Sequence, residues 1–388
     1  MVTLSDVSSS ISPSLIRKLF NMAKEMDDVV DFTLGDPDIQ PHDNIKQAAC
    51  RSIISGHTRY SQNAGLLELR NTISNYYQRK ESLYYNPLSE IAVTVGAMEG
   101  LYLTLLSLIN PGDEIIIPAP YYVNYKQMTQ LCHGKPRIVT SRVGALMVDG
   151  EDIKRAVTSK TKAIIINTPT NPSGKIFSQQ ILKEIAEIAI KNDLAVISDE
   201  VYKTLIYGNP EFKSIVNYPE MKERTILINS LSKEFCMTGY RIGYVLGPEN
   251  IIQTIIKLQE NVAACAPLPS QYAAIEALGS SNDYSADMRE TFTRRRDILV
   301  DGLKNLPGIK LESPEATFYA MIDISGLGYN SSEDFAYDLL QNAKVAVVPG
   351  LAYGDVCKQY VRLAFTLDES RIKEGVKRIS DFIKSRKS

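Results

Sequence analysis

Lys233 lies at the end of a predicted strand, in a setting suited to covalent chemistry. The apolar run 225–229 has the length and β-branched content of a buried strand. Ser230 and Ser232 precede the lysine, and Arg241 follows eight residues after it. Open α/β sheets bind ligands outside the carboxyl ends of their strands. An amine there, beside groups that can hold a phosphate, suggests a Schiff base to pyridoxal 5′-phosphate (PLP).

Polar residues also follow other apolar runs that read as strands. Asp199 closes one such run, and Tyr202 comes three residues later. A carboxylate buried at a strand end needs a cationic partner, and a protonated pyridine nitrogen would be one. Asn171 lies in a Pro-Thr-Asn-Pro-Ser-Gly turn, and Gly96 opens a helix whose backbone amides could face a phosphate. Taken singly, Asp199 also fits a helix N-cap and Asn171 an ordinary turn residue.

Composition places the chain among ordinary globular proteins. It has 388 residues, of which 44% are hydrophobic and 23% charged, and a formal net charge of −2. Neither nucleic acid nor a membrane is an expected partner, because no charge excess attracts them and no apolar run approaches ~20 residues. The five cysteines form no CxxC pair and the three histidines no metal-ligand spacing. We therefore expect a cytoplasmic protein without a metal site or signal peptide.

Apolar strands alternate with helical periodicity through the middle of the chain, which predicts a mostly parallel sheet covered by helices on both faces. The predicted strands are 91–94, 114–117, 163–167, 194–198, 225–229 and 241–246. Beyond about residue 286, a long charged helix, short strands and an amphipathic C-terminal helix indicate a smaller α+β domain. The fold class expected is α/β, with a three-layer α/β/α large domain. The expected division is an N-terminal arm and segment on the small domain (1–45), a large domain (46–285) and a small domain (286–388).

The order of these motifs resembles the fold type I PLP-dependent enzymes, and within them the class I and II aminotransferases of the aspartate and aromatic type. The segment Ser-Leu-Ser-Lys-Glu-Phe-Cys-Met-Thr-Gly-Tyr-Arg-Ile-Gly-Tyr (230–244) carries the resemblance most specifically. The resemblance extends over essentially the whole chain, from Ser14 to the C-terminal helix. It implies the PLP transferase fold and PLP as the cofactor.

The resemblance also assigns cofactor contacts to individual residues. Lys233 corresponds to the lysine that forms the imine, and Asp199 to the partner of the pyridine nitrogen. Asn171 and Tyr202 correspond to residues that hydrogen-bond the phenolic oxygen. Tyr122 corresponds to the aromatic residue that stacks on the ring, where many relatives have Trp. The residues expected around the phosphate are Gly96, Ala97, Met98, Ser230, Ser232 and Arg241.

Substrate and subunit contacts follow from the same resemblance. Arg362 corresponds to the arginine that binds the substrate α-carboxylate, which a planar guanidinium grips through two parallel hydrogen bonds. Gly35 and Asn171 are expected to complete the substrate site. Tyr60 corresponds to a tyrosine that reaches the phosphate of the neighbouring subunit, which implies a homodimer with shared active sites. Met98 replaces a lysine of some aspartate-selective relatives, so aromatic or broad specificity is favoured over strict aspartate specificity.

The implied activity is ping-pong transamination between an L-amino acid and a 2-oxo acid such as 2-oxoglutarate. Lys233 would take the Cα proton of the substrate and return it to the cofactor. Two other functions are compatible with a PLP lysine. The same fold and lysine support elimination, as in a C–S lyase. A non-catalytic PLP-binding regulator would carry an N-terminal DNA-binding module, whereas the family-like pattern here begins at Ser14.

Overall fold

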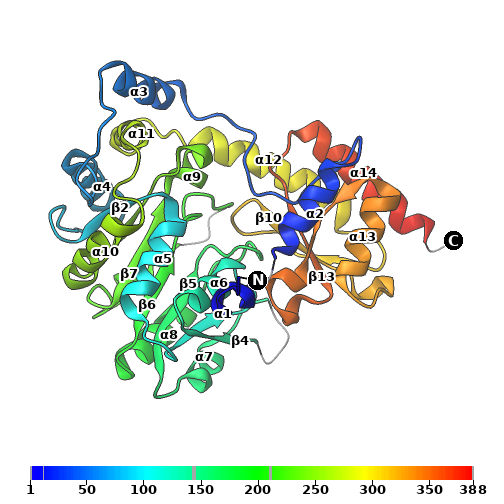
Figure 1. Ribbon diagram of the computed structural model, residues 1–388. Coiled ribbons are helices and arrows are strands. Elements are labelled where there is room, and N and C mark those ends of the chain that lie inside the picture. The colour runs from blue at the N-terminus through cyan, green and yellow to red at the C-terminus, as the bar shows by residue number, and fades with distance from the viewer. Residues whose placement is uncertain (1, 12, 142–145, 209–211, 387–388) are drawn as a thin grey trace.

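A seven-stranded sheet forms the centre of the larger part of the molecule (Figure 1). The computed structural model describes residues 2–11, 13–141, 146–208 and 212–386. The strand order is β2-β8-β7-β6-β5-β3-β4, with β8 antiparallel to β2 and β7 and the pairs from β7 to β4 parallel. The prediction of a mostly parallel sheet is confirmed. The strands are β2 (Ile91–Thr94), β3 (Glu114–Pro118), β4 (Lys135–Val139), β5 (Thr161–Asn167), β6 (Ala195–Asp199), β7 (Thr225–Ser230) and β8 (Gly243–Leu246).

Helices cover both faces of this sheet, as the predicted three-layer fold requires. Successive residues of β5 point to opposite faces, because side chains alternate along a strand. Ile165 packs in the cluster that includes α5 and α10, whereas Ile164 and Ile166 pack in the cluster that includes α7 and α8. The helices of this part are α3 (Asp43–Ile54), α4 (Leu67–Glu81), α5 (Gly96–Leu108), α6 (Asn124–Leu131), α7 (Gly150–Ala156), α8 (Gln179–Lys191), α9 (Leu231–Glu234), α10 (Glu249–Val262) and α11 (Leu268–Gly279).

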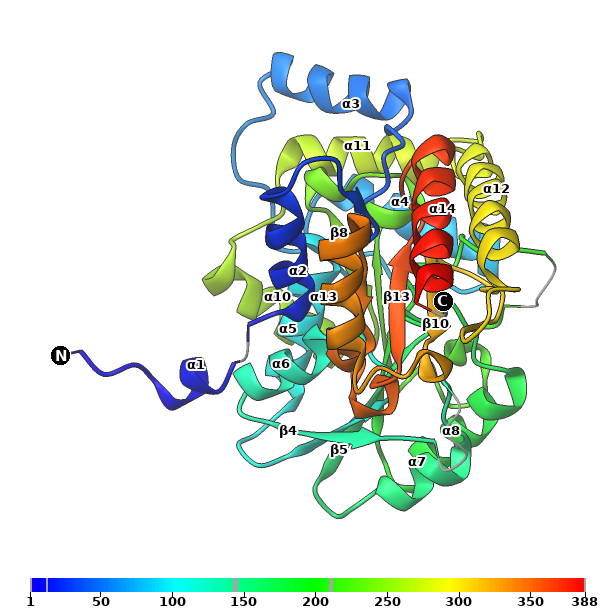
Figure 2. The same ribbon diagram turned by 90° about the vertical axis from the view of Figure 1, so that its right-hand side faces the viewer.

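A second, smaller sheet organises the C-terminal part of the chain. Its order is β12-β13-β10-β9, and every pair in it is antiparallel. Its strands are β9 (Lys310–Leu311), β10 (Tyr319–Asp323), β12 (Val348–Pro349) and β13 (Tyr360–Ala364). The helices that accompany it are α12 (Ala286–Leu303), α13 (Ser332–Ala343) and α14 (Glu369–Ser385), and Figure 2 shows them gathered beside β10 and β13.

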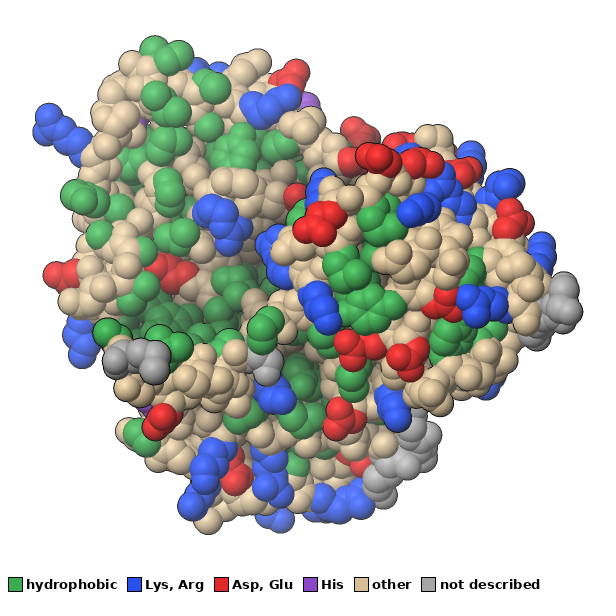
Figure 3. Space-filling view, turned by 45° about the vertical axis from the view of Figure 1, so that its right-hand side comes forward, with side chains coloured by type: hydrophobic (Ala, Val, Ile, Leu, Met, Phe, Trp, Pro, Cys, Tyr) green, Lys and Arg blue, Asp and Glu red, His purple; other side chains and the backbone are tan. Residues whose placement is uncertain are grey.

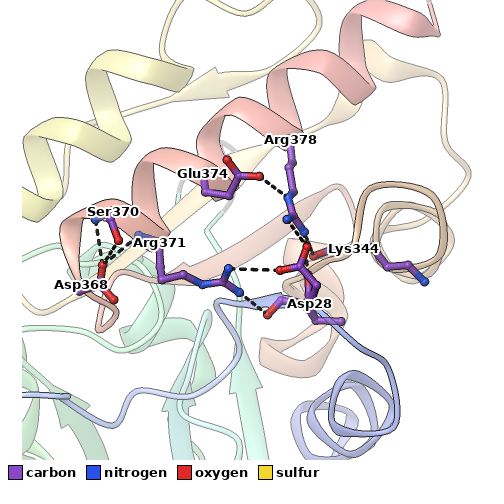
Figure 4. A network of polar contacts seen from close by, with 8 residues as sticks. Asp28, Lys344, Asp368, Ser370, Arg371, Glu374 and Arg378 are labelled. Atoms are coloured by element: carbon purple, nitrogen blue, oxygen red, sulfur yellow. Dashed lines mark hydrogen bonds and ion pairs between the residues drawn. The ribbon is translucent and has the colours of Figure 1, made fainter.

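The N-terminal segment packs on this C-terminal part. Its strand β1 (Val30–Asp31) pairs in parallel with β11 (Val345–Ala346). Asp28 lies between two arginines of α14, with its carboxylate 2.6 Å from Arg378 and 3.4 Å from Arg371 (Figure 4). Two helices precede this strand, α1 (Asp6–Ser10) and α2 (Leu15–Lys24). We propose the domain division 1–45, 46–285 and 286–388, with the first segment attached to the third.

Several elements differ from the expectation. The predicted strand 241–246 begins at Gly243, because Arg241 adopts a left-handed conformation with φ of 51°. Strand β4 was not predicted, since its residues are only partly buried and it is an edge strand that contains Pro136. Helices α6, α7, α10 and α11 were also missing from the prediction. Within the described residues, no helix combines the length and apolarity needed to cross a membrane.

Candidate active site

The predicted site residues converge where the two parts of the molecule meet. Asp199 ends strand β6, and Asn171 and Lys233 follow the neighbouring strands β5 and β7, so the three residues share one edge of the large sheet. Arg362 comes from β13 of the small sheet, and its Nη1 donates to Asn171 Oδ1 over 3.2 Å. Figure 3 shows the molecular surface hollowed between the two lobes on this side. The site is therefore built from both parts of the chain.

Lys233 extends from the short helix α9 toward the N-terminal segment. Ser230 caps this helix by accepting a hydrogen bond from the Ser232 backbone N–H over 3.1 Å. The Lys233 ammonium donates to the backbone carbonyl of Gly35 over 2.7 Å and lies 5.6 Å from the centre of the Phe318 ring. The amine is thus oriented by the Gly35 backbone carbonyl and an aromatic face.

Asp199 is a buried carboxylate at the end of β6. Tyr125 donates its hydroxyl to Asp199 Oδ2 over 2.6 Å, and the Val201 N–H donates to Oδ1 over 3.3 Å. Burial raises the pKa of Asp199 to about 6, although these two hydrogen bonds act to lower it. A positive charge placed beside Asp199 would favour the ionised carboxylate.

Arg362 is held between two tyrosine rings. Its guanidinium carbon lies 4.2 Å from the centre of the Tyr319 ring and 5.2 Å from that of Tyr353. Besides Asn171, it donates through Nη2 to the Thr33 carbonyl over 2.5 Å. Its buried Nε has no hydrogen-bond partner among the described residues. A planar cation oriented in this way is suited to a carboxylate ligand.

Tyr202 and Gly35 meet at Tyr319. The Tyr202 and Tyr319 hydroxyls lie 3.2 Å apart, and burial raises the pKa of Tyr202 above its usual range. A side chain on Gly35 would place its Cβ 1.8 Å from the Tyr319 hydroxyl. Only glycine therefore fits at position 35 without moving Tyr319.

A group of small and cationic residues lies at the start of α5. Gly96 has φ of +76°, and a Cβ there would lie 2.7 Å from Arg241 Nη2. A Cβ on Gly243 would lie 2.7 Å from the Ala97 backbone nitrogen. The Ser230 hydroxyl donates to the Ser232 hydroxyl over 2.9 Å. These hydroxyls, the guanidinium and the helix N-terminus form a set of donors suited to a phosphate.

Of the remaining predicted site residues, Tyr122 and Met98 lie beside each other, whereas Tyr60 is exposed at the surface. The Tyr122 hydroxyl is 3.8 Å from Met98 Sδ, and Asn124 Nδ2 donates to Tyr122 Oη over 3.2 Å. The Tyr122 and Tyr125 rings are edge-to-face, with centroids 5.6 Å apart. Tyr60 is 87% exposed, in contrast to the buried site residues.

Comparisons with known proteins agree on one family. The model of "Aminotransferase class I and II" matches residues 27–379. An aspartate aminotransferase of Pyrococcus horikoshii is 37% identical over 97% of this chain and 96% of its own length. An aromatic-amino-acid aminotransferase of Thermococcus litoralis is 33% identical over the full length of both proteins. This chain belongs to the class I and II aminotransferases.

Solved structures of aminotransferases have the same fold. The crystal structure of an aspartate aminotransferase from Rhizobium meliloti superposes with a TM-score of 0.95 over 99% of both chains, at 31% identity. The fold type I architecture predicted from the motifs is therefore confirmed. Class I and II aminotransferases use PLP, and this aminotransferase is a PLP-dependent enzyme.

The residues of this aminotransferase fit PLP. A phosphate requires several donors at close range, and the group around Gly96 supplies hydroxyls, a guanidinium and a helix N-terminus. A protonated pyridine nitrogen requires an acidic partner, and the Asp199 carboxylate is buried and accepts from the neutral donors Tyr125 and Val201. An imine requires an amine, which Lys233 supplies.

Several residues of the site were missed in the sequence. Tyr125 contacts Asp199, Asn167 accepts the Asn171 N–H over 2.7 Å, and Thr33 and Tyr319 contact Arg362. Tyr125 lies three residues after Tyr122, which was predicted to stack on the cofactor ring, and this short spacing was the available signal. The contacts of Tyr319 could not be read from the sequence, because its partner Tyr202 lies 117 residues away.

Proposed function

We propose that the enzyme transfers the amino group of an L-amino acid, aromatic or of broad range rather than strictly aspartate, to a 2-oxo acid such as 2-oxoglutarate, by a ping-pong mechanism. Arg362 and its two tyrosine rings carry the proposal. The guanidinium suits the α-carboxylate that every amino acid and 2-oxo acid has. Tyr319, Tyr353 and Tyr122 supply aromatic surface near it, and Met98 supplies no charge for a side-chain carboxylate.

Each residue has a separate task in this reaction. Bound PLP supplies an electron sink for the bonding pair released at the substrate Cα. Lys233 moves the Cα proton, acting first as a base and then as an acid. Asp199 keeps the proton on the pyridine nitrogen, and Arg362 orients the substrate carboxylate. Orientation of this kind contributes up to ~7–11 kcal/mol in model reactions.

A panel of amino donors with 2-oxoglutarate tests the substrate range. Asp, Phe, Tyr, Leu, Ala and Met are compared by kcat/KM, with glutamate formation as the readout. Phe or Tyr should rank at or above Asp. A preference for Asp by ~100-fold or more, which corresponds to about 2.7 kcal/mol, would contradict the proposed range. Release of pyruvate and ammonia without a 2-oxo acid would instead indicate elimination.

Reduction with borohydride tests the role of Lys233. The reduced protein should carry the cofactor on a peptide that contains Lys233, as read by mass spectrometry. Lys233→Ala should still bind some PLP but lose transamination by at least ~100-fold, because the proton-transfer group is missing. Cofactor attached to another lysine would contradict the assignment.

We also propose a homodimer in which Tyr60 contributes to the site of the partner subunit. Tyr60, Ile53 and Ile54 are close in sequence and are 87%, 53% and 84% exposed. Exposed apolar side chains in one region support an interface.

The five cysteines are free, which supports the cytoplasm as the location of the enzyme. Cell fractionation would test the location.

Mixed dimers distinguish a shared site from an internal one. Lys233→Ala and Tyr60→Phe subunits are each prepared, mixed and allowed to exchange. If Tyr60 acts across the interface, one site of each mixed dimer contains both native residues, and activity should rise above that of either variant alone. If Tyr60 acts within its own chain, no mixed site is intact and activity should not rise. A monomer by light scattering would also contradict the proposal.

A further inference from the structure

A cluster of buried charged residues lies directly behind the candidate active site. It consists of Glu81 on α4, Glu200 and Lys203 after β6, and Glu234 on α9, and we call it the buried cluster. Glu200, Lys203 and Glu234 are all buried, and the Glu81 side chain is only 17% exposed. The cluster therefore places three carboxyl groups around one lysine in the interior.

The contacts of Lys203 and its carboxyl partners connect three elements. The Lys203 ammonium forms an ion pair with Glu81 and lies 3.9 Å from the centre of the Tyr77 ring. Tyr76, on the same helix as Glu81, donates its hydroxyl to Glu234 Oε1 over 2.8 Å. Helix α4 is thus bonded both to the segment after β6 and to α9.

Glu200 is fixed by two serines. Its Oε1 accepts from Ser198 over 2.9 Å and from Ser214 over 2.5 Å. Its buried Oε2 has no hydrogen-bond partner among the described residues. Because an unpaired carboxylate oxygen is costly in the interior, Glu200 depends on the nearby Lys203 charge for compensation.

Three residues of the buried cluster are sequence neighbours of residues in the candidate active site. Glu200 follows Asp199, Lys203 follows Tyr202, and Glu234 follows Lys233. Glu200, Lys203 and Glu234 are therefore each one peptide unit from a residue proposed to act on the cofactor. A displacement of the cluster must move the backbone that carries Asp199 and Lys233.

The charges in the cluster depend on one another. Burial raises the pKa of Glu234 to about 7, and Lys203 and Tyr76 act to lower it while Glu81 and Asp283 raise it further. Burial likewise raises the pKa of Glu200. Burial disfavours the Lys203 ammonium, but Glu81, with smaller contributions from Tyr244, Tyr76 and Glu200, outweighs this and raises the pKa of Lys203. Lys203 is therefore the cation that offsets the negative charge of the buried carboxyl groups.

Stability alone does not account for such a cluster. Well-packed apolar residues often replace a buried ion pair without loss of stability, whereas removal of one partner leaves an uncompensated charge. Buried polar groups that are joined by ion pairs and hydrogen bonds also fix the relative geometry of the elements that carry them. The geometry fixed here is the relation between α9 and the end of β6.

We propose that Lys203 is a positioning residue, whose ion pair with Glu81 and whose charge near Glu234 and Glu200 hold Lys233 and Asp199 at the spacing that PLP requires. The proposal rests on the role proposed for Lys233. Lys203 itself does not touch the reacting atoms in this account. It acts through the backbone of α9 and of the segment after β6.

A double-mutant cycle tests the proposal on the complete protein. Lys203→Met, Glu234→Gln and the double variant are stripped of PLP, and the PLP dissociation constant and the visible absorbance of the Schiff base are measured. Lys203→Met should raise the dissociation constant by about tenfold or more. Adding Glu234→Gln should recover at least about threefold, because it removes a carboxylate that has lost its cation.

Two results would overturn the proposal. One is a lower melting temperature of Lys203→Met with an unchanged PLP dissociation constant and spectrum, which would make Lys203 merely structural. The other is strict additivity of the two substitutions. Lys183→Met is the control, because Lys183 lies on the exposed face of α8 and pairs with Glu187 at 3.9 Å. It should leave both readouts unchanged.

Glu234→Gln alone keeps the proposal testable if Lys203→Met does not fold. Between pH 6 and 8, wild-type Glu234 loses its proton beside Glu81, Glu200 and Asp283, so the excess of buried negative charge grows. The PLP affinity of the wild type should then fall more steeply with pH than that of Glu234→Gln. Identical pH profiles would overturn the proposal. If borohydride reduction of the wild type yields the Lys233 adduct, the role proposed for Lys233 stands even when the proposal for Lys203 is overturned.

Discussion

Asp199 shows how burial prepares a single side chain for the cofactor. The carboxyl accepts hydrogen bonds from Tyr125 and Val201, yet its pKa is about 6 because it is removed from water. A cation beside Asp199 would offset the free-energy cost of burying its ionised carboxylate. The residue was predictable because it closes an apolar strand, whereas Tyr125 was not, since the two are 74 residues apart.

The first prediction concerns the pH dependence of cofactor binding. Below about pH 6, Asp199 of the cofactor-free enzyme takes up a proton and loses the charge that attracts the pyridinium. The PLP dissociation constant should therefore rise as pH falls, by up to about tenfold per pH unit from this group. Asp199→Asn should bind PLP more weakly at pH 7.5 and lose this part of the slope. Parallel titration curves for the two proteins would contradict the prediction.

The second prediction concerns Arg362. Lysine at this position keeps the charge but loses the bidentate geometry, the bond to Asn171 and the stacking between Tyr319 and Tyr353. Arg362→Lys should lower kcat/KM by about 30- to 100-fold, with most of the loss in KM, as steady-state kinetics would show. Its PLP dissociation constant should stay near that of the wild type, which serves as the internal control. An unchanged KM would count against carboxylate binding by Arg362.

At the scale of elements, strand ends and tight turns set the site. Strands β5, β6 and β7 are buried along nearly their whole length, so their apolar runs were easily recognised. The loop at Gly35 was recognised only through a family resemblance, because its contact with Tyr319 joins distant parts of the chain. Helix α6, which positions Tyr125, carries too weak an apolar pattern to be predicted.

The third prediction compares two glycines in the same backbone region. Gly96 and Gly112 have φ of +76° and +92°, so alanine strains either turn by about 1–2 kcal/mol. A Cβ on Gly96 would also push against Arg241, whereas nothing lies within 4 Å of one on Gly112. Both alanine variants should melt at a lower temperature. Only Gly96→Ala should raise the PLP dissociation constant, by about tenfold, and equal constants would show that Arg241 does not hold the phosphate.

At the scale of the whole molecule, the site depends on contacts between the two parts of the chain. Arg362 of the small sheet reaches Asn171 after β5, and Gly35 of the N-terminal segment accepts a hydrogen bond from Lys233. The change of pattern near residue 286 indicated the smaller part from sequence. How that part would face the large sheet could not be predicted, because it depends on contacts such as these.

The pairing of β1 with β11 also bears on the synthesis of the protein. Val30 leaves the ribosome early, but its partner Val345 is made roughly 300 residues later. At ~5–20 residues per second, that interval lasts about 15–60 seconds. Nascent chains arrested before Val345 should expose residues 27–38 to protease, and full-length chains should protect them. This segment, although it is translated early, is therefore among the last to reach its native place.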